Sequence, residues 1–164
     1  DTLRWFFGDE VDSVYSVSSS GILKNLGHDT TDIYQTILTF KNGGIATMEN
    51  SWITPNTNPC VNDIKFNFTG SRGMVNLDLS NNQMIESFTQ KECKHPDVLV
   101  NHFVHGKAKG FAYESIRHFI DCLATGDEFL INLDDAINTS LVVLLILESA
   151  AKSIPVKVKY LNSD

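Results

Sequence analysis

The dipeptide Asn42-Gly43 is the feature that most constrains how this chain can fold. It lies between two runs of β-rich sequence, IYQTILTF at 33–40 and IATMENSW at 45–52. Asn and Gly tolerate the positive φ angles that a tight hairpin turn requires. The sequence therefore predicts two adjacent antiparallel strands joined by a short turn.

Further strand patterns surround this hairpin. The run VDSVYSVSS is rich in β-branched residues, and IKFNF and MVNLDL alternate on either side of a glycine-marked turn, which predicts a second hairpin. Residues 89–110, with four lysines, are predicted to form a long loop that is either exposed or ordered by a partner. The predicted strands are 11–19, 33–40, 45–52, 64–68, 74–79, 83–88 and an edge strand at 155–161.

Three segments carry helical patterns. An apolar stripe at the start of the chain ends at a glycine, as the last turns of a helix do. Apolar residues recur at helical spacing over 111–125. Asn132 or Asp134 can cap a last helix that runs to about 153. Its segment LVVLLIL, at 141–147, is apolar around the whole circumference and predicts burial on more than one side.

Strands in hairpins followed by segregated helices indicate the α+β class. We expect one domain over 1–164, with a mostly antiparallel open β-sheet of about six to seven strands and helices packed on one face. In the strand at 33–40, Tyr34 and Leu38 share one face and Ile33 and Ile37 share the other, so neither face is cleanly polar. The face without helices therefore predicts a partner, most simply a second copy of the chain.

Composition excludes several kinds of partner. The chain has 13 basic and 20 acidic residues, a net charge of −7, and no stripe of lysines and arginines with interleaved aromatics, so no nucleic-acid partner is expected. The longest apolar run is far too short to span a bilayer, and no membrane association is expected. Acidic chains of this kind are typically cytoplasmic, which is our expectation here.

Few residues suggest chemistry. The sequence contains no G-x-G-x-x-G after a strand, no H-E-x-x-H and no nucleophile elbow. A complete small hydrolase is disfavoured because no nucleophile pairs visibly with a base. His102 and His105 lack further ligands at metal-binding spacing, so no metal site is expected. The chain has three cysteines, Cys60, Cys93 and Cys122. We expect all three to be reduced, and the alternative is that one of them is a reactive thiol.

Three positions near strand ends are candidates for a small-molecule site. His28 precedes the first hairpin, where a loop can reach a pocket, although a polar turn is the favoured interpretation. Asn50 and Trp52 precede the loop TPNTNP, and an indole beside a proline-fixed loop can wall a ligand site, with core packing as the alternative. Asp134 and Asp135 are explained by helix capping and the helix dipole.

Five segments in order resemble the C-terminal domain of the Gfo/Idh/MocA oxidoreductases, the glucose–fructose oxidoreductase and inositol dehydrogenase family. Each segment alone is weak, but the five appear in the expected order across nearly the whole chain. They are DTLRWFFGDEVDSVYSV, DIYQTILTFKNGGIATMENSWITP, FNFTGSRGMVNLDL, FAYESIRHFIDCLATGD and ESAAKSIPVKV.

The resemblance implies a parent protein with an N-terminal Rossmann domain that binds NAD or NADP. In that family a Lys of an E-K-P motif, with an Asp and a His, serves hydride and proton transfer on a sugar, a polyol or a related hydroxyl or ketone compound. Asp1 would match the aspartate of the family's H-x-x-D pattern. The other motifs are missing, so the 164 residues are expected to contain no catalytic or cofactor-binding residue and to be inactive alone.

On this basis the chain would supply the substrate-side wall, with Asp1, His28, Asn50 and Trp52 as candidates. Its expected partners are its own Rossmann domain, a small-molecule substrate and further copies, in a homodimer or homotetramer formed through the open sheet face. The alternative is a freestanding, non-enzymatic module for ligand binding or assembly.

Overall fold

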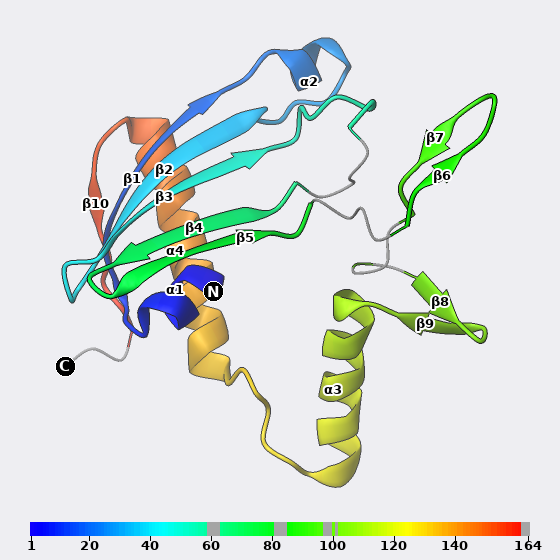
Figure 1. The fold of residues 1–164 in the computed structure, drawn as a ribbon. Coiled ribbons are helices and arrows are strands. Elements are labelled where there is room, and N and C mark those ends of the chain that lie inside the picture. The colour runs from blue at the N-terminus through cyan, green and yellow to red at the C-terminus, as the bar shows by residue number, and fades with distance from the viewer. Residues whose placement is uncertain (59–62, 81–84, 97–99, 101, 162–164) are drawn as a thin grey trace. The chain divides into compact units, whose positions relative to one another are not determined.

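The computed structural model describes residues 1–58, 63–80, 85–96, 100 and 102–161 (Figure 1). The chain divides into two compact units, one made of Asp1–Thr54 and Leu130–Asp164 and the other of Pro55–Phe129. We call them unit 1 and unit 2. The fold is α+β with a mostly antiparallel main sheet, as predicted.

Unit 1 is a four-stranded antiparallel sheet with a long helix on one face (Figure 1). The strand order is β10-β1-β2-β3, so the last strand of the chain lies at one edge, as predicted. The elements are α1 (Thr2–Phe7), β1 (Val11–Ser19), α2 (Ile22–Asn25), β2 (Ile33–Phe40), β3 (Ile45–Ser51), α4 (Leu133–Lys152) and β10 (Val156–Lys157).

The Asn42-Gly43 hairpin is confirmed, and its turn is one residue longer than a two-residue loop. The Phe40 amide donates to the Gly44 carbonyl at 2.8 Å and the Gly43 amide donates to the Phe40 carbonyl at 3.0 Å. Within this turn, Gly43 is the residue with a positive φ, of 86°. This is the three-residue loop in which glycine follows an ordinary turn and forms a bulge, so Asn42 does not need a positive φ.

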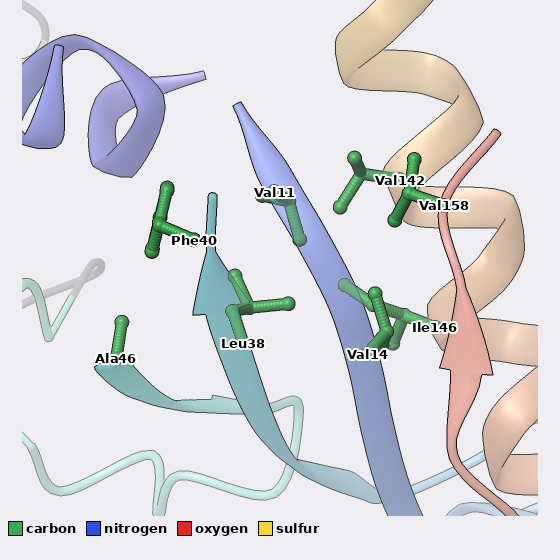
Figure 2. Packing of buried hydrophobic residues seen from close by; sticks show 8 residues of the cluster. All are labelled: Val11, Val14, Leu38, Phe40, Ala46, Val142, Ile146 and Val158. Atoms are coloured by element: carbon green, nitrogen blue, oxygen red, sulfur yellow. The ribbon is translucent and has the colours of Figure 1, made fainter. Parts of the chain in front are cut away.

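The core of unit 1 lies between α4 and the sheet. Figure 2 shows Val142 and Ile146 of α4 pointing toward the strands, where they meet the buried face of β1 and β2. Phe7 of α1 stacks on Phe40 with ring centroids 4.1 Å apart. The buried apolar cluster consists of Val11, Val14, Leu38, Phe40, Ala46, Val142, Ile146 and Val158.

The prediction that the last helix is buried on more than one side is wrong. Its start at the Asn132 cap and its end near 153 are confirmed, but only Val142, Ile146 and Ser149 are buried. Val143, Leu144 and Leu147 are exposed. The apolar run shows how hydrophobic the segment is, but the number of elements packed against it depends on the rest of the fold.

The second face of the sheet is open in the described part of unit 1. Tyr15 of β1 pairs with Ile37 of β2, and both side chains are exposed. Val17 and Ile45 are exposed as well. This set of four, which we call the open face, is the apolar surface that the sequence predicted opposite the helices.

The described part of unit 2 contains three two-stranded ribbons and one helix. The hairpin predicted at 64–79 is confirmed as β4 and β5. The segment predicted to be a long loop instead contains short ribbons, and of the predicted strand 83–88 only Ser87–Phe88 is extended, while 83 and 84 lie outside the described residues. The elements are β4 (Lys65–Gly70), β5 (Gly73–Asp78), β6 (Ser87–Phe88), β7 (Cys93–Lys94), β8 (His102–Val104), β9 (Lys107–Lys109) and α3 (Phe111–Thr125).

Candidate functional site

Arg4 of α1 joins three elements of unit 1. Its Nε donates to Glu10 Oε2 at 2.8 Å, and its Nη2 donates to the other oxygen of the same carboxylate. Nη2 also donates to Asp135 Oδ1 at 3.3 Å. Nη1 donates to the Asp135 carbonyl at 3.2 Å and to Thr139 Oγ1 at 3.0 Å. Arg4 therefore ties α1 to the residue before β1 and to the first turns of α4.

These contacts use the whole hydrogen-bonding capacity of the side chain. A guanidinium has five N–H groups, and Nε, Nη1 and Nη2 of Arg4 donate to five acceptors. The side chain is only 10% exposed. Arg4 is therefore a structural clamp, and it has no remaining donor to offer to a ligand.

The clamp shifts the ionisation of its members. The hydrogen bond from Arg4 lowers the pKa of Glu10, against the opposing effect of partial burial, and the hydrogen bond to Glu10 raises the pKa of Arg4. Nearby, burial is the main cause that raises the pKa of Tyr160, whose hydroxyl donates to the Val11 carbonyl at 2.9 Å. Both ions are thus held charged and the phenol is held neutral at neutral pH.

A hollow of about 730 Å³ lies beside this clamp, within unit 1. Besides Arg4, its lining includes four acidic residues, Asp1, Asp9, Glu10 and Asp135. Trp5, which also lines it, is 76% exposed and presents an indole surface. Carboxylates accept hydrogen bonds from hydroxyl groups, and an indole face packs on C–H surface. This combination suits a small molecule that carries several hydroxyls.

The four predicted site residues lie at two ends of the sheet. Asp1 lines the hollow, near the end where β1 starts and β2 finishes. His28 lies in the exposed segment after α2, and Asn50 and Trp52 lie at the end of β3, all at the opposite end. Because β1 spans eight residue steps between these ends, the separation is roughly 26 Å. One small ligand cannot contact both groups.

At the far end the structure places Trp52 outside the core. Its indole is 76% exposed, and its amide donates to the Asp32 carbonyl at 3.0 Å. His28 and Asn50 are exposed too. These residues lie at the same end of the sheet, and none of them lines the hollow beside the clamp.

Asp32 anchors this end of the sheet, a role that the sequence did not reveal. Its buried carboxylate accepts hydrogen bonds from the amides of Ile22 and Leu23, each at 2.8 Å. These are the first two amides of α2, so Asp32 caps that helix from ten residues further along the chain. Caps are normally sought immediately before a helix, where Gly21 stands here.

Two further observations concern the described residues only. They contain no group of three or more His, Cys, Asp or Glu side chains placed to hold a metal ion. They also contain no helix that is both long enough and apolar enough to cross a bilayer.

A family model described as the C-terminal alpha/beta domain of an oxidoreductase family, GFO_IDH_MocA_C, matches residues 1–158. The chain belongs to the Gfo/Idh/MocA oxidoreductase family. This confirms the resemblance seen in the five sequence segments, and it makes the chain a Gfo/Idh/MocA C-terminal domain. No curated protein sequence matches the chain significantly.

Solved structures share the fold of this Gfo/Idh/MocA domain. GenD2 from gentamicin A biosynthesis, in complex with NAD, is 18% identical with a TM-score of 0.74, over 95% of this chain and 44% of that one. Myo-inositol 2-dehydrogenase from Lactobacillus plantarum is 17% identical with a TM-score of 0.67, over 96% and 45%. Aldose-aldose oxidoreductase from Caulobacter crescentus, complexed with glycerol, is 19% identical with a TM-score of 0.65, over 95% and 44%. The chain thus spans less than half the length of these proteins, and at such identities the likeness shows the fold alone.

Proposed function

We propose that this chain is the substrate-side and assembly domain of an NAD(P)-dependent oxidoreductase that acts on a sugar, a polyol or a related hydroxyl or ketone compound. The match of the family model to residues 1–158 carries the proposal. Two proteins of similar structure support it, because one is a myo-inositol 2-dehydrogenase and the other an aldose-aldose oxidoreductase.

The cofactor would belong to another part of the parent protein. The sequence has no glycine-rich turn between a strand and a helix, so we assign no cofactor-binding residue to this chain. When bound, a nicotinamide accepts or supplies the hydride. What this chain contributes is the binding and orientation of the substrate.

The hollow at α1 is the best supported place for that substrate. It combines Asp1, the one residue matched to the family's H-x-x-D pattern, with three further carboxylates and an exposed indole. A sugar hydroxyl can donate to the carboxylates while its C–H face packs on Trp5. His28, Asn50 and Trp52 remain a second candidate wall at the other end of the sheet, which only a different ligand position could use.

The open face would serve assembly. Tyr15, Val17, Ile37 and Ile45 form an exposed apolar surface on a regular sheet, and such surfaces on soluble proteins commonly mark an interface. A homodimer, or a homotetramer built from it, would cover this face with its own copy.

Calorimetric titration with NAD(H) and NADP(H) tests the proposal, with this chain compared against the full-length gene product. Binding by the full-length protein and none by the 164-residue chain is the expected result, and it would justify an activity screen with polyols and sugars. If neither binds, the oxidoreductase proposal fails and a non-enzymatic module for ligand binding or assembly takes its place.

A further inference from the structure

A thiol and an imidazole face each other on the ribbon formed by β6 and β7 in unit 2. Cys93 lies on β7 and is exposed, and its Sγ is 3.5 Å from His95 Nε2. His95 follows the end of β7 by one residue, and the 3.5 Å distance places its ring on the same side as the Cys93 thiol. A base within hydrogen-bonding distance of an exposed thiol is the usual arrangement of an activated cysteine.

A carboxylate completes the arrangement on the other side of the ring. Glu86, immediately before β6, has its Oε1 at 3.8 Å from His95 Nδ1. A carboxylate at this position favours the proton on Nδ1, which leaves Nε2 as the acceptor that faces Cys93. The order thiol, imidazole, carboxylate is therefore set by the ribbon pairing, which brings Glu86 next to a strand that follows it in sequence.

Cys93 and His95 line a hollow of about 650 Å³ within unit 2. The other residues of its lining are Lys94, Pro96, Asn56, Thr57 and Asn58. Amide and hydroxyl side chains are hydrogen-bonding partners for the amides and carboxylates of a peptide. The hollow therefore fits a small polar ligand of peptide character beside the sulfur.

We propose that Cys93 is a reactive thiol that exchanges with a small peptide disulfide held in this hollow. The Cys93 proton passes to His95 Nε2 as the sulfur attacks one sulfur of the disulfide. A new S–S bond joins Cys93 to that half, the original S–S bond breaks, and the leaving thiolate takes up the proton from His95. Cys93 is oxidised and the released thiol is the reduced product. Glu86 acts as a positioning residue for His95.

Cys122 in α3 provides a contrast within the same unit. It also contacts a histidine, with His118 ring nitrogens at 3.6 and 3.7 Å, but it is only 5% exposed. Its thiol also donates to the Glu128 carbonyl, at 3.5 Å. A neighbouring imidazole does not make a thiol reactive when the thiol is buried and the imidazole is not oriented as its base.

The test uses the full chain with Cys60, which lies outside the described residues, replaced by serine. The protein is incubated with glutathione disulfide at pH 7, and mixed disulfides at Cys93 and Cys122 are followed by peptide mass mapping. An ordinary thiol is about 3% ionised at this pH, so a base can accelerate the attack by at most about thirtyfold. We expect Cys93 to react about tenfold faster than Cys122 and His95→Ala to slow it about tenfold.

Two controls separate base catalysis from a structural effect. Added imidazole should restore much of the rate in His95→Ala, and Glu86→Asp should retain more of it than Glu86→Gln. His118→Ala, the matched histidine beside Cys122, should leave the Cys93 rate unchanged. Because alanine is smaller than histidine, a slower reaction cannot come from blocked access. Equal rates in the wild type and His95→Ala, or a loss that imidazole does not restore, would overturn the proposal.

Discussion

At the scale of single residues, the clamp around Arg4 determines how unit 1 responds to acid. Glu10 accepts two hydrogen bonds from Arg4, and its pKa is lowered as a result. A carboxylate whose folded-state pKa is lowered contributes stability above its unfolded-state pKa, near 4.5, and this contribution is lost as the pH falls through the lower folded-state value. The clamp should therefore be fully effective at neutral pH and weaken below about pH 4.5.

Replacing Glu10 with Gln should lower the free energy of unfolding by about 2 kcal/mol at pH 7, because charge-assisted hydrogen bonds to a poorly exposed arginine are lost. The variant should also lose less stability than the wild type between pH 5 and pH 3, a window of about two pH units. Urea unfolding at each pH measures both effects. Glu49→Gln is the matched control, since Glu49 is exposed and contacts the neutral amide of Gln35. If the Glu10→Gln variant were as stable as this control, the Arg4–Glu10 contact would not stabilise unit 1.

At the scale of elements, the Ser149 hydroxyl accepts a hydrogen bond from β1 at a position where β10 does not pair with it. β10 pairs with β1 only at Ser13 and Val14, so the β1 amide at Ser16, a residue that pairs with Thr36 of β2 on one side, has no β10 partner on the other. Ser149 of α4 accepts that amide at 2.9 Å and donates to the Ile154 carbonyl at 2.6 Å. The buried serine thus holds β1, α4 and the segment that follows α4 in one arrangement.

Ser149→Ala should destabilise unit 1 by about 2 kcal/mol, because it leaves a buried donor and a carbonyl without partners. Ser140→Ala in the same helix removes an exposed hydroxyl bonded only to the Ala136 carbonyl, and should change stability by less than about 0.5 kcal/mol. Chemical unfolding compares the two, and hydrogen exchange at the Ser16 amide reports the local effect. Equal stabilities for both alanine variants would show that Ser149 does not bridge these elements.

Elements with local signals could be predicted from the sequence, whereas contacts between distant residues could not. The hairpin at Asn42-Gly43 and the helix end at Gly8 were predicted because their signals lie within a few residues of each other. The Arg4 contacts with Asp135 join residues 131 positions apart, and no local pattern carries that information. In the candidate site, Asp1 was predicted only through the family resemblance. Trp5 and Asp9 were not predicted as site residues, because only the fold shows that they line the same hollow as Asp1.

At the scale of the whole molecule, the open face determines the expected assembly. Ile37, on the inner strand β2, is 44% exposed and lies beside Tyr15 on β1. A homo-oligomer formed through this face would bury Ile37, whereas a monomer would leave it in water. Oligomeric state is therefore the property that a single charge on this face should change.

Ile37→Lys should convert the oligomer to monomer at micromolar concentration with little loss of fold stability, because the side chain is already exposed within the chain. Light scattering after size-exclusion chromatography measures the mass, and circular dichroism checks the fold. Ile22→Lys is the matched control, since Ile22 is exposed on α2, away from this face. A monomeric wild type at micromolar concentration would refute the assembly through this face for the chain alone.

The five donors of Arg4 also bear on how relatives of this domain should be compared. A lysine has three donors on one nitrogen and cannot reach the same acceptors, so the geometry requires arginine specifically. Relatives that build the same junction would keep this arginine whatever reaction they perform. Its retention beside a substrate hollow would then reflect architecture, and counting it among catalytic positions would assign chemistry to a residue that holds the scaffold together.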